Sequence, residues 1–307
     1  MKSPVLFLVF NRPSTTAEVF QALRRARPPR LYVSADGPRA GRSEEAQRCV
    51  EVRRIATAVD WPCEVRTLFR DANLGCREGV SQGITWFFEQ EPEGIVLEDD
   101  VLPMHGFFAY CDELLERYRH DERVASVSGC CLVADKYRAP HSYFFSRQDH
   151  VWGWASWRRA WRHYDVAMRT WPQWERSGAL LRHLDGDRCA ADYWHGIFQR
   201  AWRGEIDTWD YQWKYACWSH GGLHVLPRDN LTRNLGLGAD ATHTSKVPGC
   251  VIRNPPREPE APLRHPPDVV RDAEADRLMR RHVTGLTRLR CLKRSLRRLL
   301  PRQAARS

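Results

Sequence analysis

The sequence predicts an α/β fold with a mostly parallel central sheet flanked by helices, and three observations indicate it. Apolar runs alternate with helical patterns over the first hundred residues, which is typical of βαβ units. The apolar run GIVL at 94–97 ends directly on the acidic triplet EDD at 98–100. With 307 residues and 42% hydrophobic content, the chain can bury one large core, because single cores stop growing near roughly 250–300 residues.

The expected elements follow from these patterns in chain order. We expect strands at 5–10, 31–34, 65–69, 94–97 and 124–127. Helical patterns lie between them at 15–25, at 43–59, from the turn at 73–75 to 88, and at 107–118. We expect Pro13 to end the first strand, and Thr15 with Glu18 three residues later has the pattern of a capping box for the first helix.

Polar side chains follow four of the expected strands. They are Asn11 and Arg12 after the first strand, Asp36 after the second, Arg70 and Asn73 after the third, and Asp99 and Asp100 after the fourth. Open α/β sheets bind ligands in the crevice at the carboxyl ends of their strands. Carboxylate oxygens suit Mg²⁺ or Mn²⁺ carrying a diphosphate, so the triplet predicts a metal-assisted site for a sugar nucleotide. The alternative interpretation is an acidic turn after a buried strand.

The positive charge is concentrated at the C-terminus. The formal net charge is +10, but eleven Lys and Arg and no acidic residue lie from Arg277 onward, leaving 37 basic against 38 acidic residues in 1–276. A nucleic-acid-binding body would spread its charge over the fold, so nucleic-acid binding by the body is disfavoured. We expect a catalytic domain at 1–247, a Pro-rich linker at 248–267 and a basic helical extension at 268–307.

The basic extension has an amphipathic pattern. Leucines lie at 286, 289, 292, 296 and 299 with basic residues between them. Such a helix could lie on an anionic membrane surface, where each basic residue is worth about 1 kcal/mol. A solvated helix packed on the body and a contact with a partner protein are the alternatives.

The cysteines and the N-terminus predict a cytoplasmic protein. The ten cysteines show neither CxxC pairs nor the density of a small disulfide scaffold, so we expect free, buried thiols in a reducing compartment. The apolar run at 5–10 is too short for a signal sequence or a membrane span. We interpret it as the first strand.

Tryptophans are crowded into one part of the chain. Eleven of the thirteen lie between Trp152 and Trp218. Large aromatic side chains are mostly buried, so we expect most of them in the core, with a minority available to stack on a sugar. Gly153, in the segment VWGWASW, would let the backbone approach a donor sugar closely. The purely structural interpretation is that a helix with packed tryptophans starts here, and the two interpretations are compatible with each other. Asp149 and His150 just before it are further polar candidates.

Four motifs in order resemble nucleotide-sugar glycosyltransferases of the GT-A fold, a Rossmann-like fold. They are FNRPSTT after the first strand, VSADG after the second, LEDD after the fourth, and FFSRQDHVWGWASWRRAW downstream. Their order is similar to that in N-acetylglucosaminyltransferase I and in bacterial nucleotide-diphospho-sugar transferases, and it covers roughly residues 4–245. The resemblance implies metal-dependent transfer with inversion from a UDP-sugar to a glycan or lipid-linked acceptor. It also implies that Arg12 contacts the nucleotide or its phosphates, Asp36 the uracil or ribose, Asp100 the metal, and that Asp210 is the general base.

The remaining candidates fill the other roles of such a site. The candidate nucleotide contacts are Asn11, Asn73 and Asp99, and Asp99 is expected to reach the ribose or the water molecules on the metal. The candidate contacts near the donor sugar are Glu98, which would orient the loop, Gly153 and Trp154. His243 is a second candidate ligand for the metal or the diphosphate, and the alternative is an ordinary surface histidine. An aspartate buried among Trp209, Tyr211 and Trp213 would have its charged form disfavoured, which favours Asp210 as a base. Asp207 competes for that role, or is the N-cap of the same helix.

Two other functions are compatible with parts of the sequence. A nucleotidyltransferase that makes the activated sugar would carry a glycine-rich basic loop after the first strand, where this chain has Asn11-Arg12-Pro13. A carbohydrate-binding or membrane-scaffold protein without catalytic activity would account for the tryptophans and the basic tail. No residue pattern distinguishes uracil from other bases.

Overall fold

The computed structural model describes residues 1–237, 247–287 and 291. Its strands are β1 Val5–Val9, β2 Arg30–Ala35, β3 Glu64–Phe69, β4 Glu93–Glu98, β5 Val101–Pro103, β6 Val124–Ser128, β7 Tyr143–Ser146, β8 Trp154–Trp157, β9 Leu223–Pro227 and β10 Thr232–Asn234. Its helices are α1 Pro13–Ala26, α2 Ser43–Ala56, the π-helical turn η1 Cys76–Val80, α3 Ser81–Gln90, α4 Phe107–Arg117, α5 Arg158–Trp161, α6 Trp171–Arg176, α7 Ala179–His183, α8 Arg188–Trp202, α9 Asp210–Ser219, α10 Gly249–Arg253 and α11 Ala273–His282.

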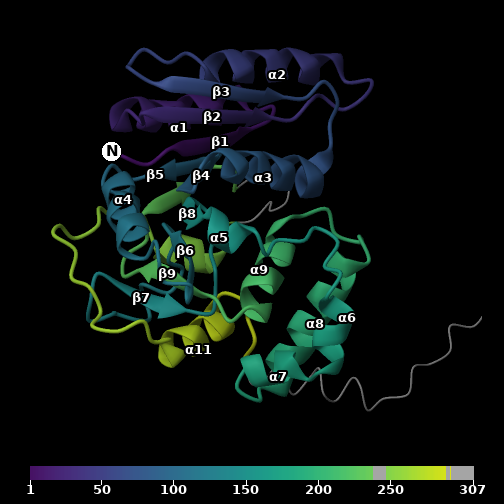
Figure 1. Cartoon of the computed structure of the whole chain (residues 1–307), viewed down its shortest axis with the longest axis vertical. Helices are drawn as coiled ribbons and strands as arrows, with labels where there is room; N and C mark the ends of the chain where they lie inside the picture. Colours follow the sequence, from purple (N-terminus) through teal and green to yellow (C-terminus); the bar gives the residue numbers. More distant parts are fainter. Residues whose placement is uncertain (238–246, 288–290, 292–307) are drawn as a thin grey trace, which may run out of the picture.

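A mixed sheet runs through the molecule (Figure 1). Within the described residues it has eight strands in the order β3-β2-β1-β4-β8-β6-β9-β7. The first four strands are parallel, β8 is antiparallel to both β4 and β6, β9 is parallel to β6, and β7 is antiparallel to β9. A separate two-stranded sheet pairs β5 with β10. The predicted α/β class with a mostly parallel central sheet is confirmed.

Helices cover both faces of this sheet because its central strands are apolar on both sides. On one face, α1, α2 and α4 pack their apolar side chains against β1, β2 and β4 in the largest core cluster. On the other face, α3, α5 and α9 pack in a second cluster around Trp154, Trp161 and Trp213. A third cluster joins α6, α7, α8 and α9 into a helical group beside the sheet, at the lower right of Figure 1.

All five expected strands are confirmed, as β1, β2, β3, β4 and β6, whereas β5, β7, β8, β9 and β10 are additional. β8 has only four residues, and it follows Gly153, which has a φ of +70°. The segment interpreted as a helix start around Gly153 is therefore a turn into a strand, and the helix α5 begins only at Arg158. The interpretation as a helix start failed because a short aromatic segment spans too few residues for its hydrophobic period to distinguish a strand from a helix.

The tryptophans are mostly core residues, as expected. In the described part of the chain, eight of the eleven between 152 and 218 are buried, Trp152 and Trp174 are half-buried, and Trp202 is 39% exposed. Neighbouring rings contact one another: the Trp154 ring stacks on Trp209 with centroids 5.7 Å apart and lies 5.6 Å from Trp213. These residues hold α9 against the sheet.

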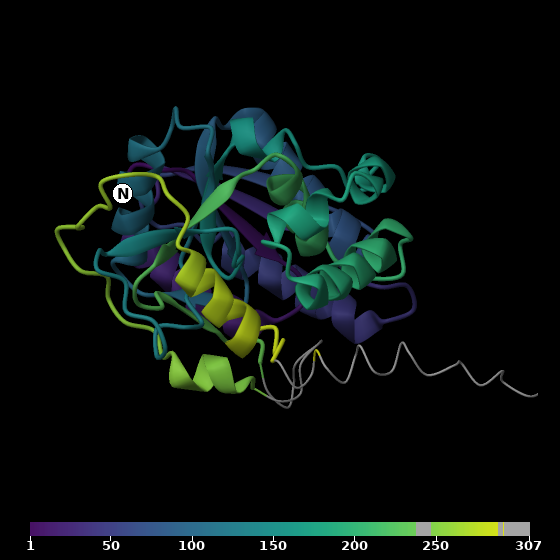
Figure 2. The ribbon, with the colours of Figure 1, turned by 90° about the horizontal axis from the view of Figure 1, so that it is seen from below.

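The described segment from 247 to 287 packs on the body. Asn254 is buried and donates to Leu132 O at 3.0 Å, and Ser142 N donates to Arg264 O at 2.9 Å. The helix α11 packs Ala275 and Met279 against β7 and β9, and Figure 2 shows it beside α10. The division into a domain at 1–247, a linker at 248–267 and an extension at 268–307 stays a prediction. Most of the leucine pattern from 289 onward lies outside the described residues.

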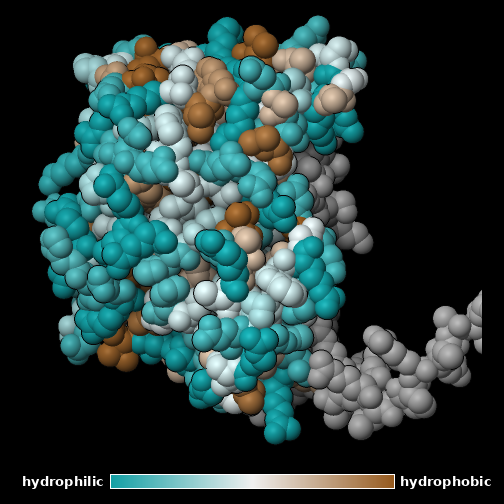
Figure 3. Space-filling view, turned by 45° about the vertical axis from the view of Figure 1, so that its right-hand side comes forward, coloured by the Kyte–Doolittle hydropathy of each residue, from teal (hydrophilic) through white to brown (hydrophobic). Residues whose placement is uncertain are grey.

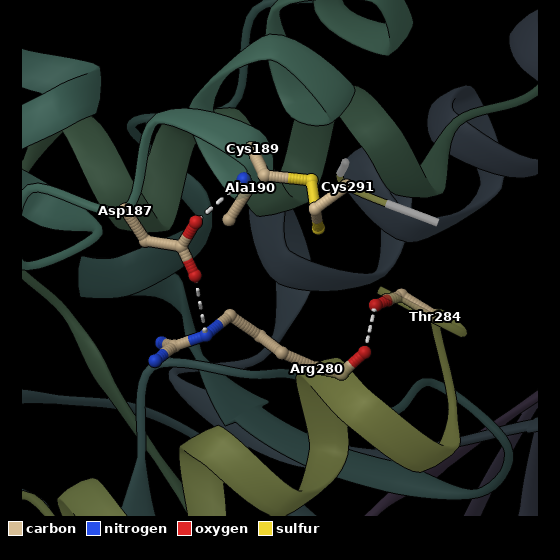
Figure 4. Close-up of a disulfide and its surroundings, with 6 residues drawn as sticks. All are labelled: Asp187, Cys189, Ala190, Arg280, Thr284 and Cys291. Carbon is tan, nitrogen blue, oxygen red and sulfur yellow. Dashed lines mark hydrogen bonds and ion pairs between the residues drawn. A yellow bond between two sulfur atoms is a disulfide. The ribbon is translucent and has the colours of Figure 1, made fainter. Parts of the chain in front are cut away.

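The expectation that all cysteines are free is wrong. Cys189, near the start of α8, forms a disulfide with Cys291, 102 residues later (Figure 4). The same end of α8 is held to α11 by an ion pair between Asp187 and Arg280 at 3.8 Å. Of the other eight cysteines, all within the described residues, six are buried and Cys63 and Cys76 are half-buried. The pairing was missed because cysteine spacing does not reveal which residues the fold brings together.

The surface in Figure 3 is predominantly hydrophilic. Apolar side chains on that face are scattered among charged and polar ones. Among the described residues, no helix is both long enough and apolar enough to span a membrane.

Candidate functional site

The acidic triplet lies at the carboxyl end of β4, in the middle of the parallel part of the sheet. Glu98 is the last residue of β4, and β5 begins directly after Asp100. Asp99 is 2% exposed, and one of its oxygens accepts a hydrogen bond from Phe10 N at 3.0 Å. The turn therefore fixes Asp99 inward and leaves the Asp100 carboxylate at the strand ends.

Arg12 connects the end of β1 to both aspartates. Its Nη2 lies 2.7 Å from Asp99 Oδ1, and its Nη1 lies 2.7 Å from Asp100 Oδ2. The pKa of Arg12 is raised: burial alone would lower it, and the Asp99 and Asp100 carboxylates more than offset that effect. Burial raises the pKa of Asp99 to about 6 in spite of Arg12.

Asp36, at the end of β2, holds the loop that follows β3. Its carboxylate accepts hydrogen bonds from Leu74 N at 3.1 Å, from Gly75 N at 3.2 Å and from Asn73 Nδ2 at 2.9 Å. Asn73 Nδ2 also donates to Gly37 O at 3.1 Å. Both residues therefore shape the backbone of this loop, and their role toward a nucleotide stays a prediction.

Asn11 faces a different partner, on α2. Its Nδ2 donates to Glu45 Oε2 at 2.9 Å. Glu45 is buried and also accepts from Arg39 N at 2.7 Å and from the Arg39 guanidinium. This network closes the side of the site between β1 and α2.

Asp207 and Asp210 make different contacts. The Asp207 carboxylate accepts from Arg77 N at 2.8 Å and from Cys76 N at 3.2 Å, so it caps η1 from 130 residues away. The expectation that it caps the helix containing Asp210 is wrong, because the N-cap of α9 is Trp209 and no side chain caps it. Asp210 is the first residue of α9, is partly exposed, and accepts a hydrogen bond from Thr208 Oγ1.

Asp210 lies close enough to the triplet for its charge to act on Glu98. The pKa of Glu98 is raised to about 8 by burial and by the charges of Asp100, Asp99 and Asp210. Cys76 lies in the same place: burial and the charges of Glu98, Asp210 and Asp207 raise the pKa of its thiol to about 12. The structure thus brings Glu98, Asp100 and Asp210 together. Sequence reasoning missed Cys76, although it directly follows the turn at 73–75.

The two proposed donor-sugar contacts after β7 are packed inside. Gly153 is buried, and its carbonyl accepts a hydrogen bond from Gly129 N at 2.7 Å. A Cβ there would lie 2.9 Å from Thr232 Cγ2, so the glycine is needed for packing as well as for its positive φ. Trp154 is 1% exposed and belongs to the aromatic core. Whether either contacts a sugar stays a prediction.

Asp149 and His150 also lie in the interior. Asp149 forms a buried ion pair with Lys214 on α9, and the Lys214 ammonium lies 5.0 Å from the centroid of the Trp194 ring. Burial lowers the pKa of Lys214 to about 7 and that of His150 to about 4. The pair fastens the 147–153 segment to the helix that carries Asp210. The lysine gave no signal in the sequence because it lies in a run of aromatic residues.

Gly236 completes the site from β10. The antiparallel pairing of β10 with β5 carries the chain back to the acidic turn, where Leu235 N donates to Asp100 O at 2.6 Å. A Cβ at position 236 would overlap Asp100 Oδ2 and lie 2.8 Å from Arg12 Nη1. His243 lies outside the described residues.

The donor set fits a divalent cation shared with a diphosphate. Among the described residues, no group of three or more His, Cys, Asp or Glu side chains could hold a metal ion by itself. Mg²⁺ is usually bound by one or two carboxylates together with substrate phosphates. Asp100 offers one such carboxylate, and its side chain is 14% exposed at the strand ends.

Comparisons with known proteins give no family. No family model matches the chain, and no curated protein matches it. Among solved structures it is similar to the apo form of mouse xyloside xylosyltransferase 1, at 12% identity and a TM-score of 0.35, over 73% of this chain and 84% of that one. It is also similar to HddC from Yersinia pseudotuberculosis, at 10% identity and a TM-score of 0.28, over 51% of this chain and 77% of that one. At these TM-scores the function has to be argued from the site itself.

Proposed function

We propose that this protein is a glycosyltransferase of the GT-A type that transfers a sugar, with inversion, from a nucleotide sugar to a hydroxyl group. The donor is a UDP-sugar, and the acceptor is a glycan or a lipid-linked glycan at the membrane surface favoured by the basic residues from 277 onward. The observation that carries the proposal is the ion pairing of Arg12, from the end of β1, with both carboxylates that follow β4. This pairing supports the proposal because the Arg12 guanidinium would bind phosphate oxygens, the Asp100 carboxylate would bind the metal, and the two groups lie side by side.

Each residue of the site has a chemical role in this proposal. The Arg12 guanidinium binds diphosphate oxygens, which it matches in charge and geometry. Asp36 fixes the loop at 73–75 that borders the nucleotide. Asp100 would hold Mn²⁺ or Mg²⁺, with Asp99 as its neighbour, and a divalent cation there neutralises charge on the leaving diphosphate.

The transfer itself needs a base on the acceptor side. Asp210 accepts the proton of the acceptor hydroxyl. The hydroxyl oxygen then forms its bond to the anomeric carbon while the bond from that carbon to the diphosphate oxygen breaks, and its electron pair leaves with UDP. Asp210 is suited to this role because it begins α9 and its charge acts on Glu98, in the same triplet as the proposed metal ligand Asp100.

A thermal-shift screen tests the proposal. Ligands stabilise the folded state by mass action, so we expect UDP, and not GDP, CDP or dTDP, to raise the unfolding midpoint in the presence of Mn²⁺. EDTA should abolish the rise. An absence of any shift with all four nucleotides would contradict the proposal and favour the non-catalytic scaffold.

The competing nucleotidyltransferase function has no support in the loop after β1. Only Phe10, Asn11 and Arg12 lie between β1 and α1. Such a connection is too short for a glycine-rich phosphate loop.

A further inference from the structure

Arg12 supplies the positive charge that two successive carboxylates share. Its two terminal nitrogens each lie 2.7 Å from one of them, Nη2 from Asp99 and Nη1 from Asp100. The guanidinium and a divalent cation would therefore compete for the Asp100 carboxylate.

The two aspartates differ in how firmly they are held. The Asp99 side chain is 3% exposed and also accepts from Phe10 N at 3.0 Å, whereas the Asp100 side chain is 14% exposed. Asp99 therefore anchors Arg12, and Asp100 is the carboxylate that can change partner. The Arg12 side chain is 32% exposed, so solutes can reach its guanidinium.

The backbone after β10 lies against this ion pair. Leu235 N donates to Asp100 O at 2.6 Å, and no side chain fits at Gly236 without displacing Asp100 or Arg12. The close packing leaves little room for a metal ion while the guanidinium remains on Asp100.

We propose that Arg12 is an exchangeable internal cation that makes binding of the divalent metal depend on the diphosphate. Before a diphosphate binds, the guanidinium holds Asp100. A diphosphate takes the guanidinium as a bidentate partner, and Asp100 is then available to the metal. The inference rests on the proposed function and adds to it a rule for how the metal and the nucleotide bind.

Electrostatics supports this dependence. A guanidinium and a divalent cation bound to the same carboxylate repel each other at close range. The negative charge of phosphate oxygens offsets this repulsion, so that the guanidinium and the metal can both stay in the site. Because linkage is reciprocal, the metal must strengthen nucleotide binding by the same factor by which the nucleotide strengthens metal binding. Removing the guanidinium should strengthen metal binding without nucleotide and weaken this linkage.

Titration of Mn²⁺ followed by electron paramagnetic resonance tests the inference on the full chain. Without nucleotide, we expect Arg12→Gln to bind Mn²⁺ at least about tenfold more tightly than the wild type. UDP should tighten Mn²⁺ binding at least about tenfold in the wild type and less than about threefold in Arg12→Gln. The matched control is Arg119→Gln, which removes the guanidinium that pairs with Glu93 at 2.7 Å at the start of β4; it should behave as the wild type.

The outcomes separate this inference from the proposed function. If Arg12→Gln binds Mn²⁺ without nucleotide no more tightly than the wild type, while UDP still tightens binding in the wild type, the inference is overturned and the glycosyltransferase stands. If neither protein binds Mn²⁺ with or without UDP, both are overturned. Should Arg12→Gln fail to fold, Arg12→Lys replaces it: one ammonium cannot bridge both carboxylates, so its nucleotide-free Mn²⁺ affinity should also exceed that of the wild type.

Discussion

Asp207 and Asp210 lie three residues apart but have separable functions. Asp207 caps η1 through two backbone amides, whereas Asp210 begins α9 near Glu98. We expect Asp210→Asn to lower kcat at least about 100-fold, since general bases contribute about 10²–10⁴-fold, with little change in the unfolding midpoint. Asp207→Asn keeps one acceptor oxygen for the cap and should leave kcat within about threefold. Steady-state kinetics and thermal unfolding measure both.

The capping role has its own control. Asp207→Ala removes both acceptors and should lower the free energy of unfolding by about 1 kcal/mol, whereas Glu205→Ala, which removes an exposed side chain nearby, should not. If Asp207→Asn lost as much kcat as Asp210→Asn, the assignment of the base would be wrong.

The sequence located these residues better than it defined their contacts. Arg12, Asp36, Asp99 and Asp100 could be placed at strand ends because the strands before them are continuous apolar runs. That Asp36 binds the loop at 73–75, or that Asp207 caps η1, depends on the path of loops distant in sequence. Local patterns carry no information on such paths.

At the scale of elements, Glu45 joins α2 to the strand ends. Hydrogen bonds from Arg39 lower the pKa of Glu45 to about 2 from an ordinary value of 4.5. A depressed pKa in the folded state stabilises the protein above the unfolded pKa, and this stabilisation is lost as the pH falls through the folded pKa. We expect Glu45→Gln to lower the free energy of unfolding by about 1–3 kcal/mol at pH 7.

The pH dependence separates this charge effect from packing. The stability difference between the wild type and Glu45→Gln should be constant from pH 7 to about 4.5 and shrink as the pH falls toward 2. Urea unfolding at several pH values measures it. A difference that does not change over that range would show that the carboxylate charge is not what stabilises the contact.

The longer elements as far as β6 were predictable, and most of the later ones were not. β1, β2, β3 and β4 alternate with helices of ten or more residues. The hydrophobic periods of strands and helices can therefore be told apart in this part of the sequence. β7, β8 and β9 have four or five residues each, too few for a clear period, and β7 and β8 are rich in aromatic residues, which suit strands and helices alike. Their order in the sheet is set by packing between segments far apart in the chain.

At the scale of the whole molecule, contacts between distant segments assemble the site. β10 returns to β5 across 129 residues at the register pair Thr232 with Pro103, which brings Gly236 to Arg12. The Lys214–Asp149 pair fastens α9 to the 147–153 segment, and the disulfide ties α8 to Cys291. Tertiary contacts of this kind have no sequence signature. This explains why the residues at the strand ends could be predicted, whereas the distant segments that contact them could not.

The release of UDP from UDP-sugars by the purified chain, with Mn²⁺ and a glycan acceptor, tests the central claim most directly. The account predicts that one UDP-sugar is turned over, that EDTA stops the reaction, and that Asp100→Asn lowers the rate at least about 100-fold while Glu93→Gln, at the other end of β4, leaves it unchanged. Turnover that persists at the wild-type rate in Asp100→Asn or in EDTA would contradict the account.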